Sequence, residues 1–508
     1  MKKVLLLVID AAAGWIVERA MEEGRLPTFR RLVEAGSFHP ASTAIFPSIT
    51  PAATASIVTG VYPCQHGIGG AAWVDAKSGD VAYYGDDFWL LASKGLGAFL
   101  DDFLVRLNHE RLESTTMFQL VERAGRQATC LNHIIFRGDV SHRVRLPLLM
   151  RLLPGSPHAA TLQGPSRLCL GQFVTAVHRR GKPVRPPAAG VLHRFGMDDA
   201  ATLGLLEQLA EDRAFTDLTV AYCADNDYRS HEVGPDGASE VLERVDEGLA
   251  TVLSAWGGLD AFLDEICLVV TSDHSQCAME ATPERAGIRL DTLLAPLRQA
   301  DLAKGWQAGD EVMICPNLRT VQIYFREHGR MRIHETIDRV LADRRVDQVF
   351  WRAAIDRPGD AGFHVATEDR GRLYLRSGGG GEALGRDDFG NAWQWEGALD
   401  ALDARVDEQG RLRFGDYPNA FERIACGLGL DESGDLWITA RPGYEFNVAG
   451  ASPHDGGGSH GALHRLDSTS PVILAGAPDG VALPEHMRTV DIVPLCLRVL
   501  DLPFAHAV

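Results

Sequence analysis

The feature that most constrains the fold is a set of short, uninterrupted apolar runs, several of which lead into a carboxylate. The runs are Lys3–Ile9, Leu218–Ala224, Ile266–Thr271 and Pro471–Ala475. The first ends at Asp10, and the third is followed by Ser272 and Asp273. Continuous apolar segments of this length are typical of strands that are buried on both faces of a parallel sheet. The sequence therefore predicts a central sheet whose strand ends carry acidic side chains.

Helical segments separate these strands. Pro27–Glu34 begins with proline and is closed by Gly36, and Ala238–Leu253 has amphipathic spacing. Ser48–Gly60 is predicted to be a loop that enters a helix, and Val490–Leu500 to be the last helix. Strands that alternate with helices predict an α/β fold, with a mostly parallel central sheet sandwiched by helices.

Two long stretches interrupt this alternation. Residues 75–215 mix helical pieces with a connector rich in proline and glycine, and residues 280–450 contain the strand-like runs Arg319–Phe325 and Arg372–Leu375. A chain of 508 residues can form several domains or one large domain with insertions. We expect a single α/β domain over residues 1–508. Within it, 75–215 is expected to be an insertion that shapes a pocket, and 280–450 a second insertion or subdomain.

Charge and cysteine content exclude several classes of protein. With 50 Lys and Arg against 68 Asp and Glu, the formal net charge is −18, so no nucleic-acid-binding surface is expected. Nine cysteines without a Cys-x-x-Cys pair do not indicate a disulfide framework, and no apolar run reaches the ~18 residues of a membrane span. The apolar run before Asp10 is shorter than the core of a signal peptide. We therefore predict a cytoplasmic protein in which this run is the first strand.

Acidic and histidine side chains collect at the predicted strand ends. They are Asp10, Asp227, His231, Asp273, His274 and His460. Ligands bind at the carboxyl ends of the strands in a parallel α/β sheet, and three aspartates with three histidines suit two divalent metal ions. Each residue alone has a plainer interpretation, as a local hydrogen bond, a helix cap or an exposed turn. Their occurrence together favours a metal centre.

As an ordered set, these motifs resemble the alkaline phosphatase superfamily, in its type I phosphodiesterase/nucleotide pyrophosphatase branch. The matching stretches are Val8-Ile9-Asp10, Phe46-Pro47-Ser48-Ile49-Thr50, Thr59-Gly60-Val61-Tyr62-Pro63, His66-Gly67-Ile68, Asp227-Tyr228-Arg229-Ser230-His231, Thr271-Ser272-Asp273-His274, Gly458-Ser459-His460-Gly461 and Arg488-Thr489-Val490-Asp491-Ile492-Val493-Pro494. The resemblance runs from residue 4 to about residue 503 and implies an alkaline phosphatase-like fold.

The resemblance also implies two metal sites and a threonine nucleophile. One site would be formed by Asp227, His231 and His460, and the other by Asp10, Thr50, Asp273 and His274. Thr50 would attack phosphorus and form a covalent phosphothreonine. The plainer alternative is that Thr50 only caps the helix that follows Pro51. Zinc is the expected metal, with manganese or iron as alternatives.

Three short stretches depart from the family pattern. Pro51-Ala52-Ala53 follows the expected nucleophile in place of Phe-Pro-Asn, and Ser275-Gln276 follows His274 in place of glycine. Gly69-Gly70-Ala71 stands where relatives carry an asparagine that binds a phosphoryl oxygen. A backbone N–H of the glycine pair could replace that donor. His133 and Arg137 are the other candidates, unless they are a solvated surface pair.

The expected function is hydrolysis of a small-molecule phosphate ester, most simply a phosphodiester or pyrophosphate. Residues 44–74 contain no Arg or Lys, and a dianionic monoester would need such a cation. Phosphomonoesterase, phosphonate hydrolase and phosphotransferase activities remain alternatives on the same metal frame. A sulfatase is disfavoured because no Cys/Ser-x-Pro-x-Arg motif surrounds Thr50. A binding protein with an inactive metal site is the alternative from another class.

Overall fold

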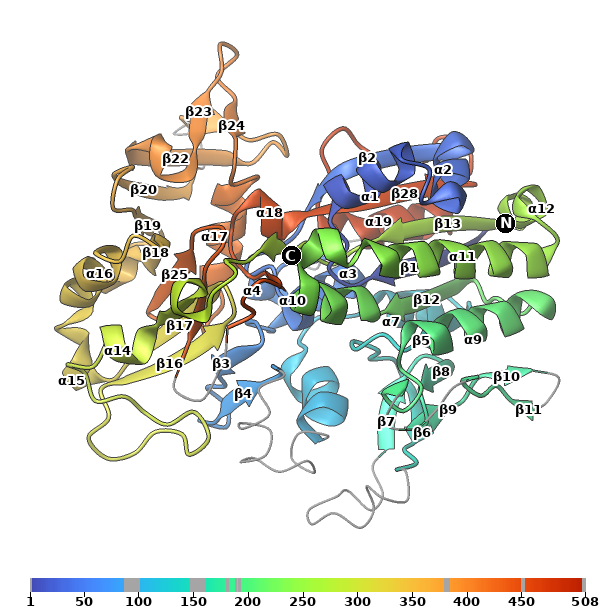
Figure 1. Cartoon of the computed structure of the whole chain (residues 1–508), viewed down its shortest axis with the longest axis horizontal. Coiled ribbons are helices and arrows are strands. Elements are labelled where there is room, and N and C mark those ends of the chain that lie inside the picture. The colour runs from blue at the N-terminus through green and yellow to red at the C-terminus, as the bar shows by residue number, and fades with distance from the viewer. Residues whose placement is uncertain are drawn as a thin grey trace.

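The computed structural model describes residues 2–85, 101–146, 161–179, 182–187, 190, 193–378, 384–448 and 453–504. Two eight-stranded sheets lie side by side, and helices pack against both of them (Figure 1). None of the helices in these ranges is both long and apolar enough to cross a membrane.

The first sheet has the strand order β2-β28-β13-β1-β12-β5-β8-β9. The strands are β1 (Lys3–Ile9), β2 (Gly36–Thr43), β5 (Ala128–Leu131), β8 (Arg167–Leu170), β9 (Val174–Thr175), β12 (Leu218–Cys223), β13 (Ile266–Thr271) and β28 (Thr469–Ala475). The five strands from β13 to β8 are parallel, whereas β28, β2 and β9 are antiparallel to their neighbours. The predicted α/β class is confirmed, and the sheet is mixed because its margins are antiparallel.

The predicted strands and helices lie close to their observed bounds. β1 and β13 have the predicted limits, and so does helix α2 (Pro27–Glu34). Helix α3 (Thr50–Thr59) begins inside the predicted Ser48–Gly60 segment, and α11 (Ser239–Trp256) extends past the predicted end. Helix α19 (Ile492–Val499) starts later than predicted, because Thr489–Asp491 forms a 3-10 turn first.

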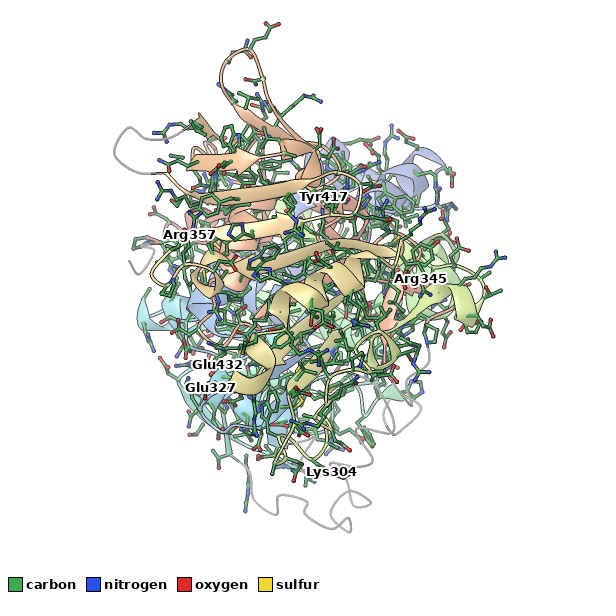
Figure 2. The ribbon with its side chains drawn as sticks, turned by 90° about the vertical axis from the view of Figure 1, so that its left-hand side faces the viewer. Lys304, Glu327, Arg345, Arg357, Tyr417 and Glu432 are labelled. Atoms are coloured by element: carbon green, nitrogen blue, oxygen red, sulfur yellow. The ribbon has the colours of Figure 1, made fainter. Side chains whose placement is uncertain are left out.

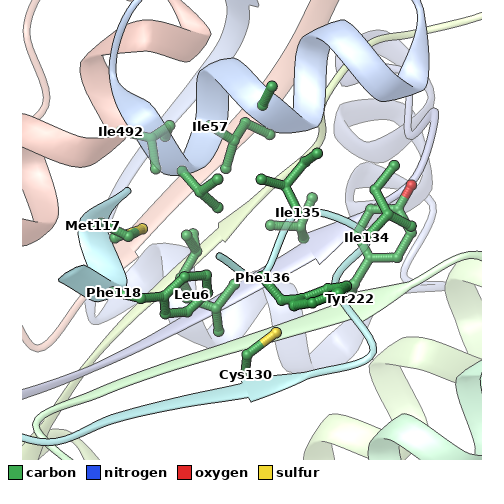
Figure 3. Packing of buried hydrophobic residues seen from close by; sticks show 14 of the residues in the cluster. Leu6, Ile57, Met117, Phe118, Cys130, Ile134, Ile135, Phe136, Tyr222 and Ile492 are labelled. Carbon is green, nitrogen blue, oxygen red and sulfur yellow. The ribbon is translucent and has the colours of Figure 1, made fainter. Parts of the chain in front are cut away.

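Alternate residues of β1 enter two separate cores, as the period of two in a strand requires. Leu6 faces a core built by α3, α7 (Met117–Arg123) and α19, where it lies near Ile57, Phe118 and Ile492 (Figure 3). Leu5 and Leu7 face the opposite core, which α1 (Gly14–Glu22), α2, α9 (Asp199–Glu211), α11 and α12 (Leu259–Glu265) cover. Helices therefore sandwich the first sheet.

The second sheet is antiparallel throughout, in the order β16-β17-β25-β18-β19-β20-β22-β21. Its strands are β16 (Val312–Asn317), β17 (Thr320–Phe325), β18 (Val346–Arg352), β19 (Phe363–Ala366), β20 (Arg372–Ser377), β21 (Gly385–Arg386), β22 (Ala392–Gly397) and β25 (Leu436–Ala440). Figure 2 shows the molecule from the side of this sheet, with Arg345 and Arg357 labelled. The described residues of 280–450 thus carry a sheet of their own, whereas those of 75–215 give β5, β8 and β9 to the first sheet.

The second sheet also has two cores. Helix α16 (Ile333–Leu341) packs on one face through Ile333, Ile337 and Val340. Helix α17 (Ala420–Leu428) packs on the other face, in a cluster that includes Phe46 of the segment before α3. Helix α17 therefore lies between the second sheet and the first part of the chain.

Candidate active site

Three neighbouring parallel strands of the first sheet end at the site. β1 lies between β12 and β13, with Ile9 paired to Cys223 and Val8 to Thr271. Asp10 follows β1, Asp273 and His274 follow β13, and helix α10 (Asp225–Gly237) after β12 carries Asp227 and His231. The register therefore places all of these side chains at one edge of the sheet.

His460 reaches the same edge through a short antiparallel pair. Strand β27 (Gly458–Ser459) pairs with β14 (Cys277–Ala278), which follows shortly after β13. His460 comes directly after β27, and its ring stacks on that of His274 with centroids 3.9 Å apart and an interplanar angle of 17°. A residue far along the chain is thus held against the end of β13.

The six predicted Asp and His side chains are brought together. His274 Nε2 lies 3.6 Å from Asp10 Oδ1 and 3.6 Å from Asp273 Oδ2. Asp227 faces two imidazoles, with Oδ1 3.5 Å from His460 Nε2 and Oδ2 3.4 Å from His231 Nε2. Two groups of three side chains could each hold a metal ion, because the potential ligand atoms within each group all lie within 4.8 Å of one another. One group is Asp10, Asp273 and His274, and the other is Asp227, His274 and His460.

Each of the three imidazoles is held at Nδ1 by a backbone carbonyl. His460 Nδ1 is 2.9 Å from Ser48 O, His231 Nδ1 is 2.8 Å from Gly458 O, and His274 Nδ1 is 3.2 Å from Ser275 O. A carbonyl oxygen only accepts, so Nδ1 carries the proton and Nε2 of a neutral ring presents a lone pair to the carboxylates. Metal-binding histidines are held in this way.

Two of the carboxylates at this edge each have one oxygen without a hydrogen-bond partner in the part of the chain that the structure describes. Asp10 Oδ1 and Asp273 Oδ2 are buried and have no hydrogen-bond partner among the described residues. Burial raises the pKa of Asp10 well above its usual range, and the charges of Asp273 and Asp227 raise it further. Burial also raises the pKa of Asp273. Bare buried carboxylates opposite imidazole lone pairs suit divalent cations, which would satisfy both.

Thr50 lies at the same edge as the first residue of α3. Its hydroxyl oxygen is 3.0 Å from Nε2 of His274, the residue that belongs to both sets of potential ligands. Ile49 is the residue that precedes the helix, and no side chain caps it. Pro51 has no N–H and Ala53 N–H donates to Ile49 O at 2.9 Å, so the N–H groups of Thr50 and Ala52 are the ones at the start of α3 that favour an anion beside Thr50.

Three polar contacts at the site were missed by sequence reasoning. The hydroxyl of Tyr222 donates to Asp10 Oδ2, and Gln276 Nε2 donates to Asp227 Oδ1. Asn226 Nδ2 donates to the carbonyl of Asp10 at 2.9 Å. A tyrosine near the end of an otherwise aliphatic strand was the available signal for Tyr222. No local pattern marks Asn226 or Gln276 as polar neighbours of the site.

Two of the candidates for a phosphoryl-oxygen donor, Arg137 and His133, have other partners, and the N–H groups of Gly69 and Gly70 stay a prediction. The next two N–H groups along the chain, those of Ala71 and Ala72, donate to Asn317 Oδ1 at 2.6 and 3.0 Å. Arg137 donates to Leu112 O, so its guanidinium is directed to that loop. His133 is fully buried edge-on against Tyr222, which excludes a solvated surface role for it.

Comparison with known proteins gives a family match and a fold. The family model described as type I phosphodiesterase/nucleotide pyrophosphatase matches residues 4–463. Phosphonoacetate hydrolase from Sinorhizobium meliloti 1021, in complex with phosphonoformate, is 16% identical, with a TM-score of 0.56 over 98% of this chain and 95% of that chain. Murine ectonucleotide pyrophosphatase/phosphodiesterase 5 is 15% identical, with a TM-score of 0.57 over 99% of this chain and 97% of that chain. No curated protein matches the sequence.

Proposed function

As a member of the type I phosphodiesterase/nucleotide pyrophosphatase family, this chain is a metal-dependent phosphoester hydrolase, and we propose that it cleaves small-molecule phosphodiester or pyrophosphate bonds through Thr50. The observation that carries the proposal is the position of the Thr50 hydroxyl. It lies at the start of α3, 3.0 Å from Nε2 of His274, the residue that is common to the two ligand sets.

The side chains at the sheet edge would hold two divalent ions. Asp227, His231 and His460 would bind one, and Asp10, Thr50, Asp273 and His274 the other. Three imidazoles with otherwise oxygen ligands favour zinc, with manganese or iron as alternatives. The ions would supply positive charge that acidifies the Thr50 hydroxyl and offsets the charge of the phosphoryl oxygens.

The residues of the chain then act in two displacements. In the first, Thr50 Oγ1 gives its proton to solvent and bonds to phosphorus, while the bond from phosphorus to the leaving alcohol or phosphate oxygen breaks and the alcohol oxygen takes up a proton from solvent. In the second, the oxygen of a water molecule bonds to phosphorus and gives up a proton, while the bond to Thr50 Oγ1 breaks and Thr50 regains its proton. The N–H groups at the start of α3 stabilise the phosphoryl oxygens in both steps. The carbonyl contacts at Nδ1 keep the imidazoles in place, so little reorganisation is needed.

The charge around Thr50 favours a monoanionic substrate. Residues 44–74 contain no Arg or Lys, and the N–H groups of Ala71 and Ala72 are already bound to Asn317. A dianionic monoester gains less in such a site than a diester does. Phosphomonoester and phosphonate hydrolysis and phosphotransfer use the same displacement, so they are the alternatives that the experiment must separate.

The test compares bis(4-nitrophenyl) phosphate, 4-nitrophenyl phosphate and phosphonoacetate with zinc-loaded protein. We expect the diester to turn over fastest and a chelator to abolish turnover. Thr50→Ala should lower kcat by at least about 10³-fold, whereas Thr50→Ser keeps a hydroxyl and should retain part of the activity. Acid-quenched wild-type protein turning over bis(4-nitrophenyl) phosphate should carry a 4-nitrophenyl phosphate group, esterified to Thr50, on the peptide that contains Thr50.

Two outcomes would overturn the proposal. Wild-type turnover in Thr50→Ala would remove Thr50 from the mechanism. A monoester or phosphonoacetate turned over faster than the diester would reassign the substrate class while leaving the metal frame and the nucleophile in place.

A further inference from the structure

Arg423 of helix α17 is a fully buried guanidinium behind the segment that leads to Thr50. Its side chain is 0% exposed. No carboxylate of the described residues lies within 4.0 Å of it, unlike Arg319, the other fully buried arginine, which pairs with Asp467. Buried guanidinium groups are usually paired. Arg423 is therefore unusual among buried arginines, since it has no acidic partner within 4.0 Å among the described residues.

All of its hydrogen bonds go to neutral oxygens. Nη2 donates to Ser468 Oγ at 2.6 Å, Ser48 Oγ at 3.0 Å and Ile45 O at 3.3 Å, and Nη1 donates to Leu463 O at 2.8 Å and Pro418 O at 3.1 Å. One planar group thus joins the 45–48 segment to the 463–468 segment. Its fixed fork of donors suits such a bridge.

These two segments carry parts of the active site. Ser48 is two residues before Thr50, and its carbonyl oxygen is 2.9 Å from His460 Nδ1. Leu463 is three residues after His460. Arg423 therefore contacts directly both the segment that leads to Thr50 and the loop that carries His460, a predicted metal ligand.

The second sheet fixes the position of Arg423. One helical turn further along α17, Gly427 lies against the nucleophile segment, where an added Cβ would be 2.7 Å from Phe46 O. The Phe46 ring in turn packs against Trp437 of β25 and Phe350 of β18, with centroids 5.2 and 5.7 Å apart. Helix α17 is thus clamped between the second sheet and the Thr50 segment.

We propose that Arg423 is a positioning residue for the reaction, which sets the Thr50 hydroxyl relative to the His460 imidazole by joining Ser48 to Leu463. The inference rests on the proposed role of Thr50. It gives the second sheet a part in positioning the active site, because the guanidinium contacts both segments from a helix that packs on that sheet. Burial lowers the pKa of Arg423 to about 9, which leaves the guanidinium charged at neutral pH; its two terminal nitrogens have five acceptors, and its Nε is buried without a partner among the described residues.

The test uses Arg423→Gln, Arg423→Lys and Ser48→Ala, with Arg345→Gln as the control. Arg345 also joins separate segments, through Gly287 O and Asp343, but it lies on the outer side of the second sheet (Figure 2). Displacing Thr50 by a fraction of an ångström should lower kcat of Arg423→Gln by about 10²-fold with KM within about threefold, and Arg345→Gln should keep the wild-type kcat. Arg423→Lys should recover part of the loss.

A second readout does not depend on turnover. The visible spectrum of the cobalt-substituted protein reports ligand geometry, and it should change in Arg423→Gln and stay unchanged in Arg345→Gln. If the Gln variant does not fold, Arg423→Lys and Ser48→Ala carry the test, because each removes only part of the bridge. Wild-type kcat and spectrum in both would overturn the inference. Thr50→Ala separately decides the proposed function, so the two failures are distinguishable.

Discussion

At the scale of single residues, the orientation of each active-site imidazole depends on the hydrogen bond that its Nδ1 makes. A backbone carbonyl faces Nδ1 of His231, His274 and His460, and this contact decides which nitrogen turns toward the carboxylates. His66 is held differently. Its Nδ1 accepts from Ile68 N at 3.1 Å and its Nε2 lies 3.0 Å from Ser56 Oγ, in a fully buried position. A second proton on Nδ1 would face the Ile68 N–H, so the folded protein disfavours the protonated ring.

His66 should make the protein less stable in mild acid. Burial lowers its pKa to about 3, whereas an unfolded histidine titrates near 6.5. The unfolded chain therefore binds the extra proton between these values, and stability falls as the pH drops below 6.5. At pH 5 the loss is about 2 kcal/mol. Urea unfolding at pH 7.5 and pH 5 measures it. His66→Gln should show a smaller acid loss, and an equal loss would contradict the assignment.

The site residues differ in how far the sequence predicted them. Asp10, Asp273 and His274 were predicted because each follows a recognisable buried strand. Tyr222 and Arg423 were not, because their partners lie 212 and 375 residues away, at Asp10 and Ser48. Nothing in the local pattern around Arg423 distinguishes it from an exposed arginine on an amphipathic helix.

At the scale of elements, the central parallel strands β1, β12 and β13 were predicted, whereas the buried parallel strands β5 and β8 and the partly exposed β2 were not. β1 and β13 are continuous apolar runs covered on both faces, so their bounds follow from hydrophobicity. β2 was missed because most of its residues are only partly buried and Pro40 interrupts it. The strand-like runs Arg319–Phe325 and Arg372–Leu375 predicted β17 and β20. The pairing of strands in the second sheet was not predicted, because it depends on contacts between residues far apart along the chain.

Gly427 tests the close approach of α17 to the nucleophile segment. In an open helix, Gly→Ala stabilises by about 1 kcal/mol through helix propensity. Here the added methyl would meet a backbone oxygen at 2.7 Å, so Gly427→Ala should destabilise the protein and lower kcat. The control is Gly248→Ala in α11, where the nearest atom is the movable tip of Leu203. Thermal unfolding of both variants should give opposite signs, and a stabilised Gly427→Ala would show that α17 is not closely packed.

At the scale of the whole molecule, metal binding should contribute to stability. Asp10, Asp227 and Asp273 are buried around His274, and the charges of Asp273 and Asp227 raise the pKa of Asp10, so their repulsion opposes folding until cations offset it. A metal at 100 times its Kd stabilises the folded state by about 2.7 kcal/mol. A chelator should therefore lower the unfolding temperature.

Two aspartate variants check that this stabilisation comes from the site. Asp273→Asn should shrink the effect of the chelator. Asp435→Asn, at a buried carboxylate of the second sheet that accepts from Phe325 N, should leave it unchanged. Equal chelator effects in wild type and Asp273→Asn would place the cation elsewhere.

The strand order of the first sheet also bears on how the protein is made. β28 lies between β2 and β13, yet it leaves the ribosome about 200 residues after β13, roughly 10–40 s later at the usual speed of translation. Until then, β2 has no partner strand and one edge of β13 is open. The second sheet is synthesised in that interval. Exposed edges invite pairing with other chains, so slow translation or truncation before β28 should favour aggregation in the cell.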